Sequence, residues 1–401
     1  MSHLTPLIGI GLILFTAFLL SKNRKAIRFR IVGWGLGLQF LLALFVMKTQ
    51  LGLWMIQNVS NAAVWFLNFA FQGTKFVFGP ILGDPHGSQG FVFAFTALPM
   101  IIYVASFFAL LYYLRVLPLL VLGAGKAMFK LFGTSGAESL EVAASIIMGQ
   151  TEAPLVIRPY LEGLTESELF TIMTAGMAHI AGSVFGAYVL FGADARHLLT
   201  AVVMTAPGTI LIAKILYPET DKPQTAGTVK LTLEKRDVNM LDAISHGVGD
   251  GMFLALNVGA MLVAFIALIY LTNGILGLVH TDLQTIFGYA LAPVAWMLGV
   301  PWQDAMQVGN LMGIKVVLNE FVAFSQLGPL KGVIAPRSFA IATYALCGFA
   351  NFSSIGIQIG GIGSLAPNRK QDLARLGFRA LLAGTLANYL AAAIAGLLLP
   401  Y

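Results

Sequence analysis

The stretch SIIMGQTEAPLV, residues 145–156, contains one charged residue, Glu152, among apolar, small or uncharged neighbours. A second stretch, LMGIKVVLNEFVAF, residues 311–324, contains Glu320 in a similarly apolar setting. The other charge there, Lys315, is badly placed for a salt bridge to Glu320 on a regular helix. A carboxylate at membrane depth is costly unless it faces a partner or a wet cavity. Both glutamates are therefore candidates for a functional site.

The composition of the whole chain is that of a membrane protein. Of its 401 residues, 58% are hydrophobic and 10% are charged, whereas soluble domains carry roughly 25% charged residues. The apolar runs are long and continuous, which favours helices over the short alternating strands of a membrane barrel. The sequence predicts an all-α polytopic membrane protein. Most basic residues lie in loops between the runs, so the net charge of +6 does not indicate a nucleic-acid partner. The single Cys347 excludes an intrachain disulfide.

Eight runs are long enough to be transmembrane helices. The first is interpreted as a retained span, because no basic segment precedes it and no cleavage pattern follows it. Two shorter pieces, 139–161 and 305–326, are broken by polar residues. Amphipathic segments within 49–90 and 118–135 predict interfacial helices on the outer and inner faces. The eight predicted spans are 4–20, 31–47, 91–114, 170–193, 198–217, 251–279, 339–364 and 376–400.

The basic residues orient the predicted spans. Most of the 24 Lys and Arg residues follow the first, third and fifth spans or lie between the seventh and eighth. Loops rich in Lys and Arg stay in the cytoplasm. We therefore expect both termini outside the cytoplasm.

The two acidic segments begin similar series of elements. A broken segment, a helix with a polar centre and a final apolar span occur in 139–217 and again in 305–400. Ser183 follows Glu152 by as many residues as Asn351 follows Glu320. The orientation above makes the two series an inverted repeat, an arrangement typical of secondary transporters, which bind substrate between the repeats. The predicted organisation is a scaffold (1–135), a first transport repeat (136–217), a loop with a long scaffold span and an interfacial helix (218–300), and a second transport repeat (301–401).

Several motifs resemble the signatures of the concentrative nucleoside transporter family, which includes the bacterial nucleoside permeases. The motifs are GQTEAPLV (149–156), NEFVA (319–323), GFANFSSIG (348–356) and FVFG (76–79). The resemblance implies eight transmembrane helices, re-entrant hairpins near 138–161 and 305–335, and interfacial helices. It also implies a homotrimer in the bacterial inner membrane that imports nucleosides by alternating access.

The resemblance also implies the roles of eight residues. Gln150, Thr151 and Glu152 would face the nucleobase, with Val184 beside it. Glu320 would bind the ribose hydroxyls together with Asn351 and Ser354, and Phe349 would pack against the ligand. The chemistry agrees, since a ribose diol offers two donors to an ionised carboxylate, which only accepts.

The coupling ion is where the sequence departs from the family pattern. In sodium-coupled members, the ion site resembles an Asn and a Ser at the positions that here hold Ser145 and His179. Carbonyls near Met148 and Ile180 would remain available. A His nitrogen suits sodium poorly and titrates near neutral pH. These four residues are thus tentative ion-coupling residues. Proton coupling is favoured, with His179 or Glu152 in the proton step, and sodium coupling stays open. No cofactor is expected.

Two other functions are compatible with acids inside a membrane: a subunit of a proton-translocating complex, and an intramembrane enzyme. An enzyme would require a nucleophile with a base, or a metal motif such as HExxH, and neither pattern occurs. The sequence leaves open the nucleoside preference and the stoichiometry.

Overall fold

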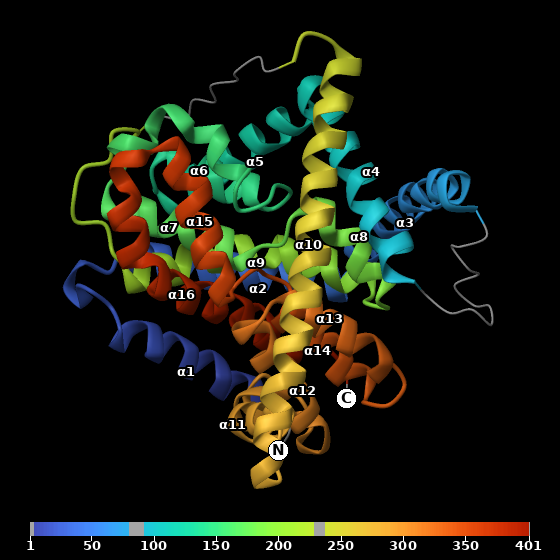
Figure 1. Cartoon of the computed structure of the whole chain (residues 1–401). Helices are drawn as coiled ribbons and strands as arrows, with labels where there is room; N and C mark the ends of the chain where they lie inside the picture. The colour runs from blue at the N-terminus through green and yellow to red at the C-terminus, as the bar shows by residue number, and fades with distance from the viewer. Residues whose placement is uncertain (1–3, 80–91, 228–236, 401) are drawn as a thin grey trace.

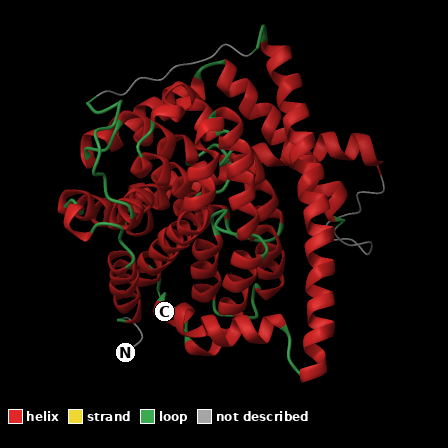
Figure 2. Cartoon of the chain, turned by 60° about the vertical axis from the view of Figure 1, so that its left-hand side comes forward, coloured by secondary structure: helices red, strands yellow, loops and turns green. Residues whose placement is uncertain are grey.

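The computed structural model describes residues 4–79, 92–227 and 237–400 and consists of helices and loops, without a β-strand in these ranges (Figure 2). The predicted all-α class is confirmed. The end of the predicted outer interfacial segment (80–90), residue 91 of the third span and part of the loop 218–237 lie outside the described residues.

The first part of the chain forms five helices. The predicted amphipathic segment is one 29-residue helix, α3, which begins where the Thr49 side chain accepts from Gly52 N. Trp54 and Trp65 on this helix are exposed, as expected at a membrane surface. The helices are α1 (Thr5–Leu19), α2 (Phe29–Lys48), α3 (Gln50–Phe78), α4 (Phe93–Tyr113) and α5 (Val116–Phe132), with the short η1 (Arg24–Ala26) after α1.

The same order of elements then occurs twice, separated by two further helices (Figure 1). Each series has a pair of short helices, an interrupted helix in two halves, and a long apolar helix. The first series is α6 (Gly136–Ser145), η3 (Ala153–Gly163), α7 (Glu166–Ala178), α8 (Gly182–Leu190) and α9 (Ala195–Leu216). The separating helices are α10 (Met240–Leu276) with η4 (Gly277–Val279), and α11 (Leu283–Met297). The second series is α12 (Trp302–Val317), α13 (Glu320–Leu327), η5 (Gly328–Leu330), α14 (Pro336–Leu346), α15 (Phe352–Leu365), η6 (Pro367–Arg369) and α16 (Lys370–Leu398).

Six helices of the described chain are long and apolar enough to cross a membrane, if α7 and α8 are taken as one. All eight predicted spans fall on helices, but two do not meet this length criterion. α1 has only 15 residues, and the span predicted at 339–364 is divided into α14 and α15. A sharp 116° bend separates α11 from α12. Gly299 at φ +100° and Pro301 as the N-cap residue produce this bend.

The long helix α10 runs along one side of the bundle and packs on α4 (Figure 1). Small residues permit the close approach: a Cβ atom on Gly251 would lie 2.8 Å from the Cα atom of Ile102. Close packing of small residues is the usual basis of helix association in membranes. α10 also contacts α13 and forms one wall of the site described below.

Candidate functional site

The tip of the first hairpin presents three polar residues. α6 starts with a capping box between Ser135 and Glu138 and ends at Ser145. The second arm, η3, starts at Ala153, with Pro154 in its first turn, where a missing N–H costs nothing. Gln150, Thr151 and Glu152 therefore lie in the non-helical turn between the arms.

The tip of the second hairpin places a carboxylate at the first position of a helix. Asn319 is the N-cap residue of α13, and its Oδ1 accepts from Val322 N at 2.9 Å. Asn is among the preferred N-cap residues, and an acid in the first turn suits the positive end of the helix dipole. The local sequence thus fixes Glu320 at the start of α13, where it is 4% exposed.

The breaks in the two interrupted helices complete the site. α7 ends at Ala178, and His179 continues in extended backbone before α8 begins. In the second repeat, Asn351 is the N-cap residue of α15, and its Oδ1 accepts from Ser354 N at 2.8 Å. The Asn351 amide nitrogen is left free to donate elsewhere.

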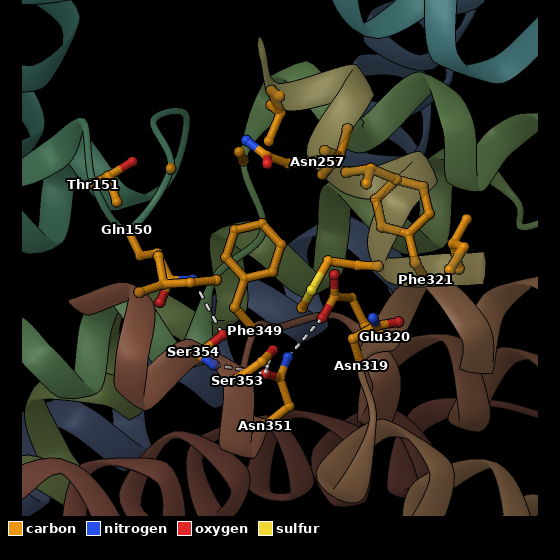
Figure 3. Close-up of a pocket in the computed structure, with 18 of the residues that line it drawn as sticks. Gln150, Thr151, Asn257, Asn319, Glu320, Phe321, Phe349, Asn351, Ser353 and Ser354 are labelled. Carbon is orange, nitrogen blue, oxygen red and sulfur yellow. Dashed lines mark hydrogen bonds between the residues drawn. The ribbon is translucent and has the colours of Figure 1, made fainter. Parts of the chain in front are cut away.

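All eight predicted substrate-binding residues line one cavity of about 170 Å³ (Figure 3). Hairpin tips and helix breaks supply them, although they are distant in the sequence. They are Gln150, Thr151, Glu152, Val184, Glu320, Phe349, Asn351 and Ser354.

Glu320 is held by two donors. Tyr188 of α8 donates its hydroxyl to Oε1 at 3.0 Å, and Asn351 donates its amide to Oε2 at 3.1 Å. A carboxylate has about four acceptor positions, so roughly two remain for a ligand. The sequence interpretation missed Tyr188, which follows Val184 by one helical turn and so shares its face.

A second polar group lies on the side of the first hairpin. Gln150 donates to the Ser354 hydroxyl at 3.1 Å (Figure 3) and accepts from Gln358 at 3.2 Å. Gln358 also donates to the Met173 carbonyl at 3.0 Å, which ties α15 to α7. The sequence interpretation missed Gln358, although it lies one helical turn after Ser354.

The wall opposite these groups comes from α10. It is apolar except for Asn257, which Figure 3 shows across the cavity from Phe349 and Glu320. The cavity thus combines apolar surface with a few polar groups, as small-molecule sites generally do. The α10 residues in the lining are Leu254, Asn257, Val258, Met261 and Leu262.

The four tentative ion-coupling residues are not in the lining of this cavity. They lie behind the first hairpin tip, where Gly182 N donates to the Ile147 carbonyl at 2.8 Å. The His179 ring contacts the Ala175 carbonyl through Nδ1 at 3.0 Å, while its buried Nε2 has no hydrogen-bond partner among the described residues. These four residues are Ser145, Met148, His179 and Ile180.

Ser145 has an acidic partner that the sequence interpretation missed. Its hydroxyl donates to Oε1 of Glu141, one turn earlier in α6, at 3.0 Å. Glu141 is 0% exposed, and its Oε2 has no hydrogen-bond partner in the part of the chain that the structure describes. A buried carboxyl beside a candidate ion residue is therefore part of this region. Its position one helical turn before Ser145 could have revealed it.

Models of known protein families match most of the chain. Family models described as "Na+ dependent nucleoside transporter N-terminus", "Nucleoside recognition" and "Na+ dependent nucleoside transporter C-terminus" match residues 8–81, 94–195 and 197–396. The chain is 40% identical to "Nucleoside permease NupC" of Helicobacter pylori over 99% of this chain and 98% of that protein.

Solved structures show the same architecture. The chain resembles CNTnw in an inward-facing substrate-bound state with a TM-score of 0.95, 42% identity and coverage of 99% and 98% of the two chains. A variant of CNTnw in an outward-facing state matches with a TM-score of 0.94, 40% identity and the same coverage.

Proposed function

The chain belongs to the concentrative nucleoside transporter family, and we propose that it imports nucleosides across the bacterial inner membrane, driven by an ion gradient. Members of the family are transporters and not enzymes. The observation that carries the proposal is the cavity in which both hairpin tips and both helix breaks present polar groups. Relatives in inward-facing and outward-facing states support alternating access.

The ribose is assigned to Glu320 and the base to the first hairpin. Glu320 keeps roughly two acceptor positions after its bonds to Tyr188 and Asn351, which suits the two hydroxyls of a ribose diol. Gln150, Thr151 and Glu152 offer an amide, a hydroxyl and a carboxyl to the mixed donors and acceptors of a base edge. Phe349 provides an apolar ring against the ligand.

Loss of one ribose hydroxyl should weaken binding strongly. A hydrogen bond to a charged group contributes about 1.5–3 kcal/mol, which corresponds to roughly tenfold to hundredfold in affinity. Unlabelled 3′-deoxyuridine should therefore inhibit the uptake of labelled uridine only at concentrations roughly tenfold to hundredfold higher than unlabelled uridine requires. Equal competition by the two compounds would exclude a carboxylate contact with the 3′-hydroxyl.

Proton coupling is favoured over sodium coupling by the residues behind the first hairpin. Ser145 offers a hydroxyl that already bonds to the buried Glu141 carboxyl, and His179 offers an imidazole. Both Glu141 and His179 can bind a proton, whereas an imidazole nitrogen is a poor sodium ligand. Glu141 thus joins His179 and Glu152 as a candidate proton carrier.

Uptake by proteoliposomes tests the proposal and separates the two ions. Purified protein should accumulate radiolabelled uridine when the outside is acidic, with no sodium present. An imposed sodium gradient at constant pH should add little. Strong sodium stimulation at constant pH would refute proton coupling but keep nucleoside transport, whereas no uridine uptake under either gradient would refute both.

The assembly and movement follow the family pattern. We propose a homotrimer with both termini outside the cytoplasm. The hairpins and interrupted helices would move as one body against a scaffold built mainly from α1, α2, α4 and α10. The α10 wall of the cavity, apolar except for Asn257, faces polar groups from the hairpin tips and helix breaks, which supports this division.

A further inference from the structure

The ends of the two interrupted helices meet at a buried node outside the residues proposed for substrate and ion. Asn388 of α16 is 0% exposed. Its amide nitrogen donates to the carbonyl of Ala178, the last residue of α7, at 2.6 Å. It also donates to the carbonyl of Cys347, the C-cap residue of α14, at 3.0 Å. One amide therefore binds the open ends of both helices, whose last carbonyls have no partner within the helix.

Two glycines make this close approach possible. A Cβ atom on Gly348 would lie 2.3 Å from Asn388 Oδ1 and 2.5 Å from the Ala178 carbonyl oxygen. A Cβ atom on Gly384 of α16 would lie 2.5 Å from the Met177 Cβ atom. All three of these distances are shorter than packed atoms allow, so neither position has room for a side chain and α16 lies directly against the helix ends.

Lys315 brings a basic side chain to the node. Its side chain comes from α12 and is 0% exposed. Its ammonium group donates to Asn388 Oδ1 at 2.7 Å and to the carbonyl of Ala345, in the last turn of α14, at 2.9 Å. These acceptors are neutral oxygens. The C-terminus of a helix carries roughly half a negative charge, so two such ends attract a cation. In transporters, ends of this kind bind coupling ions.

We infer that Lys315 is a resident cation, attached to the chain, that occupies a cation position at the end of α14 and is linked to the end of α7 through Asn388. It acts as a positioning residue. By binding Asn388 and Ala345 it holds the second hairpin against both helix breaks. Glu320 follows Lys315 closely in the sequence, and Asn351 follows the break between α14 and α15. The bonds of Lys315 therefore fix the position of Glu320 relative to Asn351. The break between α14 and α15 then requires no exchangeable cation to bind its carbonyl groups.

A cation-rescue experiment tests this role without any substrate. Lys315→Ala removes the charge and leaves space, whereas Lys315→Met fills most of the space without charge. The melting temperature of each purified variant is measured in choline chloride and in methylammonium chloride at equal ionic strength. Methylammonium should raise the melting temperature of Lys315→Ala only, because a ligand bound to the folded state stabilises it. Lys331→Ala, at an exposed lysine, is the control and should not respond.

The absence of a methylammonium effect on folded Lys315→Ala would overturn the inference. If that variant does not fold, Lys315→Gln decides, because it keeps hydrogen-bond donors but not the charge. We expect Lys315→Gln to bind uridine about 100-fold more weakly than the unmodified protein, from the loss of a cation at two helix ends. Binding as tight as that of the unmodified protein would contradict a role for the charge.

The uridine measurement rests on the proposed function, whereas the melting measurement does not. If the unmodified protein binds no uridine, the proposed function fails, and methylammonium rescue of Lys315→Ala still decides the role of Lys315. If the unmodified protein binds uridine but folded Lys315→Ala does not respond to methylammonium, only the inference about Lys315 fails.

Discussion

Glu320→Gln is expected to abolish uridine uptake while the protein stays folded. The substitution removes the charge and replaces one acceptor oxygen by a donor NH2 group. In the unmodified protein both oxygens of Glu320 accept hydrogen bonds, one from Tyr188 and one from Asn351. The NH2 group of the glutamine would therefore face a hydrogen-bond donor. Two charge-assisted bonds to the ribose would also be lost, each contributing about 1.5–3 kcal/mol. We expect the uridine dissociation constant to rise at least about 100-fold.

The matched control is Glu162→Gln, the same chemical change at an exposed position of η3 outside the cavity. It should transport uridine like the unmodified protein. Size-exclusion profiles and melting temperatures of both variants report whether they fold. Near-normal uptake by folded Glu320→Gln would remove the ribose role of this residue.

Glu141→Gln is expected to uncouple transport from the proton gradient. The amide has nearly the shape of the carboxyl and can still accept the bond from the Ser145 hydroxyl, but it cannot bind and release a proton near neutral pH. We expect uridine accumulation driven by an acidic outside to disappear. Exchange of internal unlabelled uridine for external labelled uridine should continue, because the substrate cavity does not include Glu141.

The comparison of accumulation with exchange makes this result specific. A variant that has merely lost its fold would lose both activities. The control Glu162→Gln should keep both. Accumulation by Glu141→Gln equal to that of the unmodified protein would exclude Glu141 as the proton carrier and leave His179 and Glu152.

Sequence motifs could predict the residues whose structural role depends on neighbours only a few positions away in the sequence. Gln150, Thr151 and Glu152 stand together at a turn that Gly149 and Pro154 enclose. Asn319 and Asn351 are N-cap residues, so the starts of α13 and α15 are encoded within a few positions. This is why the hairpins and helix breaks, and with them the cavity lining, follow from short motifs.

The residues that sequence analysis missed act across long separations. Tyr188 bonds to Glu320, 132 positions away, and Asn388 bonds to Lys315, 73 positions away. A tyrosine on an apolar helix and an asparagine in an alanine-rich span are both compatible with ordinary packing. Only the folded arrangement shows that each completes a buried polar group, which must find partners because desolvation is costly. Glu141 is different, since its spacing to Ser145 was visible in the sequence.

The most direct test of the account is a structure of the protein with uridine bound. The account predicts uridine in the cavity between the two hairpin tips, with ribose hydroxyls within hydrogen-bond distance of Glu320 and the base beside Gln150, Thr151 and Glu152. Uridine in the opposite orientation, or bound outside this cavity, would contradict it.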